Sequence, residues 1–245
     1  IYILISCMLC VSSLHADSKI RALPFIQTPI DNESVILLCE KLKIECATTD
    51  IKLYRVKGAI DAYYYLIDPS PKLFKLYKDQ GQFTLIDQWD FKNYQHSHQS
   101  NGEEDGLQRT GLKIYPAFYP LNKKDISIAI LDDWFGGYSG GGRSEQYADF
   151  VQLSSNGKYQ LVIADQLFYS SEMIRACFSE QDYHTSLHCH DESGTLLSIQ
   201  FKDIGQPYYQ WILNYTDYDW PADEPETHKK TKKYSTSIIP FQDLK

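Results

Sequence analysis

Residues that could carry out nucleophilic catalysis occur in the middle of the chain. The segment Gly137-Tyr138-Ser139-Gly140-Gly141 fits G-x-S-x-G, the pattern of the turn that presents the nucleophile in many serine hydrolases. Asp165 and His184 follow it in the order in which those enzymes place the acid and the base. That turn must lead from a strand directly into a helix, whereas residues 146–151 alternate like a strand. We therefore expect no catalytic residues, and a hydrolase that uses Ser139, Asp165 and His184 is the alternative.

Three histidines in the second half of the chain could bind a metal ion. On a strand, His188 and His190 would project to the same face, and His184 or Asp191 could supply a third ligand for zinc or copper. The competing interpretation is a surface turn, closed by a disulfide, that happens to carry histidines. We favour this second interpretation and predict no metal and no other cofactor. The site formed by His184, His188 and His190 is the alternative.

Acidic and aromatic side chains suggest two further kinds of binding site. An acidic cluster after the last strong strand pattern lacks the glycine of an EF-hand calcium loop, so we interpret it as solvated. Its members are Asp217, Asp219, Asp223, Glu224 and Glu226. Aromatic rings could stack on sugars, which makes a glycan- or cell-wall-binding module a second alternative, although rings at alternating spacing more often belong to a core. These rings are Tyr63, Tyr64, Tyr65, Tyr208, Tyr209, Trp211 and Trp220.

A glycine-rich segment is the feature around which we interpret the chain. Residues 126–131 form an apolar strand pattern, and residues 136–143 contain five glycines and are predicted to form a loop. Alternating runs at 146–153 and 158–163 then flank Asn156-Gly157, which is a strong hairpin signal. We expect the loop and the residues before it to contact a protein partner. The predicted contact residues are Asp132, Asp133, Trp134, Tyr138, Ser139 and Arg143.

The remaining patterns predict a mainly β fold. A helix is expected at residues 33–42 after a capping signal at 31–34, and period-two runs then predict an antiparallel meander. Residues 195–201 and 209–215 form a second hairpin pattern with aromatic residues on one face. Such strand spacing suits a sandwich, a barrel or a propeller-like sheet with one N-terminal helix. The predicted strands of the meander are residues 51–56, 61–67, 72–78 and 83–89.

Two polar stretches divide the chain. Residues 92–111 are rich in Asn, Gln, His, Ser and Gly, and we interpret them as a mobile loop in which His96-Ser97-His98 is solvated. Residues 221–245 are interpreted as a charged tail. The expected units on either side of the loop are a helix with a β-meander at 17–91 and an antiparallel β region at 112–220.

The apolar N-terminus and the cysteines predict export. Residues 1–16 have the pattern of a signal peptide with cleavage near Ala16, which predicts a periplasmic or secreted protein. Cys7 fits a lipid-attachment box, and only lipidation there would place the protein at a membrane. The net charge of −8 disfavours nucleic acid as a partner and is compatible with a basic protein. Removal of residues 1–16 would leave four cysteines. These are expected to form the local disulfides Cys39–Cys46 and Cys177–Cys189.

A resemblance adds a functional expectation. The segment Met173-Ile174-Arg175-Ala176-Cys177-Phe178-Ser179-Glu180, with Cys189-His190-Asp191 and the glycine-rich loop, resembles uncharacterised exported β-rich proteins of Gram-negative bacteria. The resemblance implies a periplasmic protein without catalytic residues, and some small proteins of this kind are immunity proteins that block toxins attacking the cell wall. By this analogy we predict a periplasmic, non-enzymatic binding protein that occludes the active site of a secreted cell-wall-degrading toxin.

Overall fold

The computed structural model of the chain describes residues 19–46, 50–99 and 106–242. The predicted signal peptide, with Cys7 and Ala16, lies outside the described residues. The elements in chain order are β1 (Leu23–Gln27), α1 (Asn32–Leu42), β2 (Lys52–Val56), β3 (Tyr63–Asp68), β4 (Lys72–Asp79), β5 (Gln82–Asp90), β6 (Gln108–Pro120), β7 (Ile126–Tyr138), β8 (Gly141–Leu153), β9 (Tyr159–Arg175), α2 (Glu180–Thr185), β10 (His190–Lys202), β11 (Gln210–Trp220), the short 3-10 helix η2 (Glu226–His228) and β12 (Lys230–Ile238).

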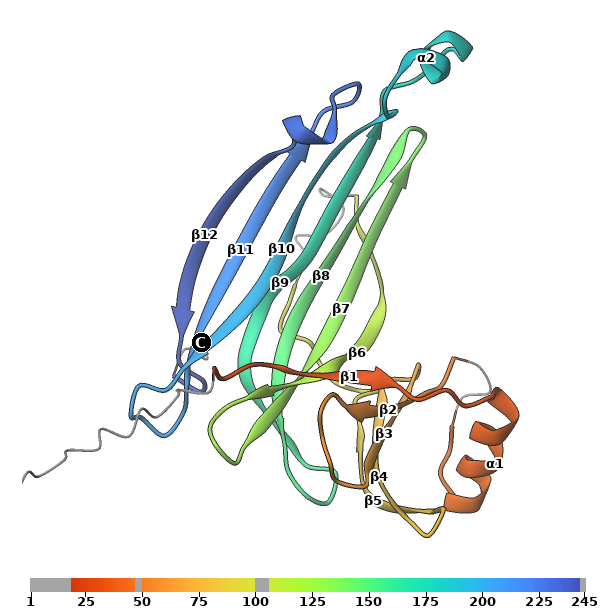
Figure 1. Cartoon of the computed structure of the whole chain (residues 1–245), viewed down its shortest axis with the longest axis vertical. Coiled ribbons are helices and arrows are strands. Elements are labelled where there is room, and N and C mark those ends of the chain that lie inside the picture. Colours follow the sequence, from red (N-terminus) through yellow and green to blue (C-terminus); the bar gives the residue numbers. More distant parts are fainter. Residues whose placement is uncertain (1–18, 47–49, 100–105, 243–245) are drawn as a thin grey trace, which may run out of the picture.

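The strands form one open sheet in which every neighbouring pair is antiparallel. Its order is β12-β11-β10-β9-β8-β7-β6-β1-β2-β3-β4-β5. The predicted mainly β, antiparallel fold is confirmed, and of the predicted arrangements the closed barrel does not apply, because the sheet is open with β12 and β5 as its edges among the described residues. Figure 1 shows a tall curved layer of β6–β12 and a shorter layer of β1–β5 at its lower end.

The apolar core of the tall layer lies at its lower end, where the curved sheet brings distant strands into contact. Trp211 of β11 is fully buried, and its ring centroid lies 4.9 Å from that of Phe150 in β8 and 5.9 Å from that of Tyr119 in β6. The backbone N–H of Tyr209 also donates to the carbonyl oxygen of Leu121 at 2.7 Å. Burial of one such large apolar side chain contributes about 1.5–3 kcal/mol. These contacts give the upper part of the sheet a packed base.

The predicted N-terminal helix is confirmed as α1. The Asp31 carboxylate accepts a hydrogen bond from the backbone N–H of Ser34 at 2.8 Å, and this bond, with a second one from the Ser34 hydroxyl, holds the pKa of Asp31 below its usual value. Lys43 caps the other end with a left-handed backbone, at φ 53°. Val35 and Leu38, three residues apart on one side of the helix, are buried in the apolar cluster that packs α1 against the smaller layer.

Both predicted disulfides are present. Cys39–Cys46 ties α1 to the chain that follows it, and Cys177–Cys189 closes the excursion between β9 and β10. That excursion contains α2, a short helix that our sequence analysis does not predict and that Ser179 and Asp182 cap reciprocally. Disulfides are typical of proteins in oxidising compartments.

The glycine-rich segment is not the loop that its composition led us to expect. β7 continues to Tyr138, β8 begins at Gly141, and the two strands pair up to a two-residue turn. A Cβ atom at Gly141 would overlap with the carbonyl oxygen of Met173 in β9. This glycine therefore allows close approach of neighbouring strands rather than a flexible backbone.

The two predicted hairpins are confirmed. Asn156 and Gly157 have positive φ values of 61° and 69°, as tight hairpin turns require, and they lie between β8 and β9. β10 pairs with the whole of β11 without a register shift, with Phe201 directly opposite Trp211. The local sequence is sufficient to predict both hairpins, because the turn residues and the alternating apolar pattern indicate the same pairing of strands.

The predicted charged tail contains a strand. Residues 230–238 form β12, which pairs with β11 at the edge of the sheet. The register places Lys230 opposite Asp219 and Lys232 opposite Asp217. An exposed edge strand has no face that must be apolar, so β12 lacks the alternating pattern by which we predict strands. Opposite charges across the ladder stabilise it instead.

The predicted mobile loop is shorter than expected and partly buried. Residues 108–111 belong to β6, and residues 100–105 lie outside the described residues. The ring of His96, which we expected in solvent, is buried, and its Nε2 lies 3.1 Å from the carbonyl oxygen of Ile130. Because Nδ1 of His96 accepts a hydrogen bond from the backbone N–H of His98 at 3.0 Å, the ring proton belongs on Nε2.

Candidate functional site

The structure does not bring the residues of the alternative hydrolase together. Ser139 lies in the turn between β7 and β8, whereas Asp165 lies in β9 at the level of Ala148. Ala148 is seven residues beyond the first residue of β8, which corresponds to about 23 Å along a strand. The Asp165 carboxylate contacts His98 at 2.8 Å, and His184 lies on α2. Ser139 therefore has no Asp165–His184 pair within reach.

The histidines of the alternative metal site have separate partners. Nε2 of His188 lies 3.1 Å from the carbonyl oxygen of Glu224, and its ring packs against Trp220 at 3.9 Å between centroids. His190 is the first residue of β10, and His184 lies on the exposed helix α2. Within residues 19–46, 50–99 and 106–242, no three His, Cys, Asp or Glu side chains are arranged to hold a metal ion.

Two of the six predicted contact residues have structural roles. Asp132 and Asp133 are only 1% and 6% exposed. Asp132 accepts a hydrogen bond from Nε of Arg109 at 2.6 Å, and Asp133 forms an ion pair with Lys113. Arg109 and Lys113 belong to β6, so these aspartates link β6 to β7, and we remove them from the candidate contact surface.

The other four predicted contact residues lie near the upper end of the tall layer. Alternation along β7 places Trp134 and Tyr138 on one face, and Arg143 of β8 shares it because it is directly opposite Gly136. Tyr138 is exposed, and Ser139 occupies the turn. The structure thus brings together part of the predicted surface on one face of the sheet.

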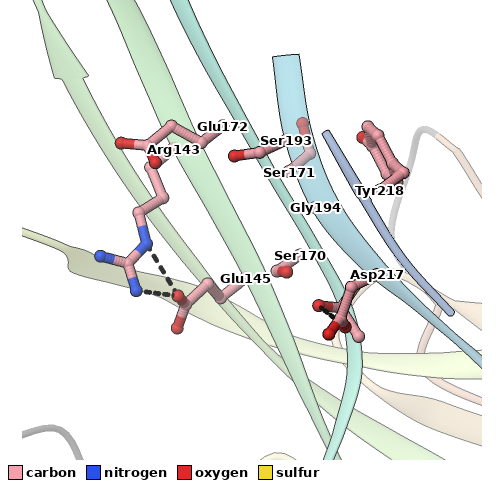
Figure 2. A pocket seen from close by; sticks show the side chains of 10 residues that line it. Arg143, Glu145, Ser170, Ser171, Glu172, Ser193, Gly194, Asp217 and Tyr218 are labelled. Atoms are coloured by element: carbon pink, nitrogen blue, oxygen red, sulfur yellow. Dashed lines mark hydrogen bonds and ion pairs between the residues drawn. The ribbon is translucent and has the colours of Figure 1, made fainter. Parts of the chain in front are cut away.

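A polar groove of about 410 Å³ crosses this face from β8 to β11, as Figure 2 shows. Seven of its residues form two rows. Within each row, the residues on neighbouring strands are directly opposite one another, so the register of the four strands assembles the groove. The row nearer the β7–β8 turn is Arg143, Glu172 and Ser193, and the second row is Glu145, Ser170, Thr195 and Asp217. Ser171, Gly194 and Tyr218 complete the lining.

Glu145 lies at the β8 end of the polar groove, and its charge is compensated within the protein. Its side chain is 8% exposed, and Oε1 accepts a hydrogen bond from Nε of Arg143 at 2.8 Å. Oε2 accepts one from the hydroxyl of Tyr147 at 2.6 Å. Burial, and next this hydrogen bond, raise the pKa of Tyr147, so its hydroxyl stays a proton donor. The negative charge that remains in the groove comes from Glu172 and Asp217.

A partly buried segment, which the sequence pattern did not indicate, contacts the same strands, β8 and β9, as the polar groove. Residues 94–98, named the strap here, are held by Asp149 of β8, which is fully buried. Its carboxylate accepts hydrogen bonds from the Tyr94 hydroxyl at 2.9 Å and from the backbone N–H groups of Ser97 at 2.7 Å and Asp165 at 2.8 Å. The available signal is Asp149 itself, a lone acid within the apolar run 148–151, because a buried carboxylate requires several donors.

Apolar side chains are exposed at the far end of the tall layer, where the β7–β8 turn meets the disulfide-closed excursion that carries α2 (Figure 1). Phe178 and Tyr183 are 74% and 52% exposed, and Cζ of Arg175 lies 5.4 Å and 5.6 Å from their ring centroids. The backbone N–H of Arg175 donates to the carbonyl oxygen of Gly140, which joins the excursion to the turn. The exposed side chains of this apolar tip are Tyr138, Met173, Ile174, Phe178, Tyr183 and Leu187.

Comparisons of the chain with protein-family models, with curated proteins and with solved structures give no significant match. Within the described residues, no helix is long and apolar enough to cross a membrane. The fold and the site define an open antiparallel sheet with two disulfides, a polar groove on one face and an apolar tip at one end.

Proposed function

We propose that this protein is an exported, non-enzymatic binding protein that docks its apolar tip on a protein partner, in the manner of an immunity or inhibitor protein that blocks a cell-wall-targeting toxin. The observation that carries the proposal is the concentration of exposed apolar side chains at one end of a packed, cross-linked sheet. Exposed apolar side chains that gather in one place mark interaction surfaces more often than scattered ones do.

The residue types of the apolar tip suit the centre of a protein interface. Phe178, Tyr183 and Tyr138 supply aromatic anchors, and Met173 supplies an adaptable side chain. Arg175 packs on two of these rings and adds a cation. Aromatic residues, methionine and arginine are enriched where interfaces bury most of their binding energy, so a partner pocket that accepts Phe178 and Tyr183 would be the main contact.

The apolar tip is held in place before it binds. The disulfide Cys177–Cys189 closes its excursion, and the backbone bond from Arg175 to Gly140 fixes that excursion to the β7–β8 turn. A preorganised surface loses less conformational entropy on association. In Figure 1 the excursion with α2 projects beyond the neighbouring strands, so it suits a concave surface such as an enzyme cleft, which it would block sterically.

Charge and compartment agree with this proposal. The net charge of −8 would accelerate the encounter with a basic partner and would disfavour acidic competitors. Two disulfides suit an oxidising compartment, and we propose the periplasm, with residues 1–16 as the export signal.

The test is capture from the exported protein fraction of the native cell, with the immobilised full chain as bait. We expect one specific protein to be retained, and we expect its enzymatic activity to fall when the free chain is added. The double variant Phe178→Asp/Tyr183→Asp should lose both effects, because it places charge in the apolar contact. Leu196→Asp, a matched change at an exposed leucine of β10, should retain both. Capture of nothing specific, or equal capture by the tip variant, would refute the proposal.

A further inference from the structure

We propose that the polar groove is a second binding site, which takes a neutral oligosaccharide. The inference rests on the lining of the groove and on the strand register, and it stands independently of the partner proposed for the apolar tip. Its volume of about 410 Å³ falls in the range of small-ligand sites, which run from roughly 300 to 1,000 Å³. Such sites are mostly apolar, whereas every lining side chain here is polar or aromatic apart from Gly194, which has none. A ligand that fits must exchange hydrogen bonds along its whole length.

Hydroxyl groups occupy the centre of the polar groove. Ser193 and Thr195 of β10 lie between Ser170 of β9 and Asp217 of β11, and the Thr195 hydroxyl donates to Asp217 at 2.9 Å. Serine and threonine hydroxyls both donate and accept, as sugar hydroxyls do. A polyhydroxylated chain can therefore satisfy this surface without bringing a charge.

The carboxylates of the polar groove are too far apart to converge on one cation. Glu172 belongs to β9 and Asp217 to β11, and strands two positions apart are separated by about 10 Å. The third carboxylate, Glu145, is already engaged by Arg143 and Tyr147. Glu172 accepts one hydrogen bond from the Tyr138 hydroxyl, and Asp217 accepts one from Thr195. Each of these two carboxylates therefore keeps acceptor capacity for ligand hydroxyls, and their charge repels acidic sugars. The arrangement thus favours a neutral saccharide over an ammonium group or an anionic one.

The row between the two polar rows contains Gly194 and Tyr218, whose side-chain positions face the other side of the sheet. Tyr218 lies directly opposite Gly194, where a Cβ atom would come within 2.8 Å of the tyrosine hydroxyl. The glycine thus leaves the space that the Tyr218 side chain occupies, and Nζ of Lys229 lies 4.1 Å from the ring centroid. Because side chains alternate along β11, the Tyr218 ring lies on the face opposite Asp217, and the polar groove recognises a ligand by hydrogen bonds rather than by stacking.

The experiment is calorimetric titration of the full chain with a panel of defined probes. The neutral probes are the tetramers of N-acetylglucosamine, of β-1,4-linked glucose and of α-1,4-linked glucose. The charged probes are tetragalacturonic acid and tetralysine. We expect at least one neutral tetramer to bind with a dissociation constant on the order of 1 mM or tighter, and we expect no heat of binding from either charged probe.

Variants locate the binding within the molecule. Ser193→Tyr fills the middle of the polar groove and should abolish saccharide binding, whereas Ser198→Tyr places the same side chain elsewhere on β10 and should leave it unchanged. Asp217→Asn keeps the size of the side chain and should weaken binding about tenfold by removing a charged acceptor, which guards against a folding defect in Ser193→Tyr. The tip variant Phe178→Asp/Tyr183→Asp should bind the saccharide as the unmodified chain does.

Three outcomes would overturn the proposal. The first is the absence of binding by every neutral tetramer. The second is saccharide binding that survives Ser193→Tyr and Asp217→Asn. The third is tetralysine binding that these two variants abolish, which would make the groove a site for basic peptide. None of these outcomes bears on capture of a partner by the apolar tip, so the two proposals fail separately.

Discussion

The ring of His98 stacks on the ring of Tyr147, with centroids 3.4 Å apart and planes 8° from parallel. Nδ1 of His98 also lies 2.8 Å from Oδ1 of Asp165 in β9, so the end of the strap is fastened to two strands of the sheet. Tyr147 in turn donates its hydroxyl proton to Glu145 of the polar groove. A continuous series of contacts therefore connects the strap to the polar groove.

Asp149→Ala should destabilise the protein by at least about 3 kcal/mol, because three donors would lose the acceptor that satisfies them in the interior. The donors are the hydroxyl of Tyr94 and the backbone N–H groups of Ser97 and Asp165. Urea denaturation measures the change. Asp219→Ala, at an exposed acid of β11 directly opposite Lys230, is the control and should cost no more than about 1 kcal/mol. Equal losses in the two variants would contradict the role given to Asp149.

Substitution by alanine should affect the stability of the protein differently at the two adjacent glycines Gly140 and Gly141 of the β7–β8 turn. Gly141→Ala should destabilise by about 1–3 kcal/mol, because the new methyl group meets the carbonyl oxygen of Met173 and the strands must move apart. Gly140→Ala should be close to neutral, because the nearest atom to its Cβ position is Cβ of Arg175 at 3.7 Å. Thermal unfolding of both variants checks this difference. If both glycines tolerated alanine, the segment would be the open loop that its composition suggests.

Tyr65 should contribute to a loss of stability at alkaline pH. Burial, and next the charges of Asp61 and Tyr63, raise the pKa of Tyr65 from 10.0 to about 12. The fold favours the neutral phenol, so this contribution is complete below about pH 10 and is lost as pH rises through about 12. Tyr65→Phe keeps the ring that stacks on Phe25 and should make the decline in unfolding free energy over this interval smaller by about 2–3 kcal/mol. Parallel curves for the two proteins would show that Tyr65 titrates normally.

Removal of the disulfide Cys177–Cys189 should act locally. In the variant Cys177→Ser/Cys189→Ser, we expect the free energy of local opening of the excursion to fall by about 2–3 kcal/mol. The packed lower core should keep its protection from hydrogen exchange. The backbone N–H of Ala176 reports on this opening, because it donates to the carbonyl oxygen of Cys189 at 2.9 Å. Hydrogen exchange at this amide should accelerate and exchange at Trp211 should not. Uniform acceleration at both would mean that the cross-link supports the whole sheet.

Features that depend on a few adjacent residues could be predicted from the sequence. The cap at Asp31 and the Asn156-Gly157 turn each determine a local backbone path, and both disulfides join cysteines that are close in the chain. The strap and the polar groove depend on distant residues and could not be predicted. Tyr94 meets Asp149 across 55 positions, and the groove exists only when four strands adopt one register.

The structure changes the interpretation of the predicted contact segment, because it shows which neighbouring strand covers part of it. Alternation along β7 puts Asp132 and Asp133 on opposite faces, and both are buried in links to β6. The sequence pattern identified polar side chains near glycines but carried no information about the strand that covers them. Of the exposed aromatic side chains of the apolar tip, Tyr138 lies in the predicted segment, whereas Phe178 and Tyr183 come from the disulfide-closed excursion, where apolar periodicity is absent.

Site-specific photocrosslinking tests the docking role of the apolar tip most directly. A benzophenone amino acid replaces Phe178 in one preparation and Ile86, an exposed residue of β5 in the smaller layer, in another. After irradiation with the exported protein fraction, we predict a single crosslinked partner from position 178 and none from position 86. Crosslinks of equal yield and identity from both positions, or none from position 178 while the partner is still captured by the chain, would contradict the account.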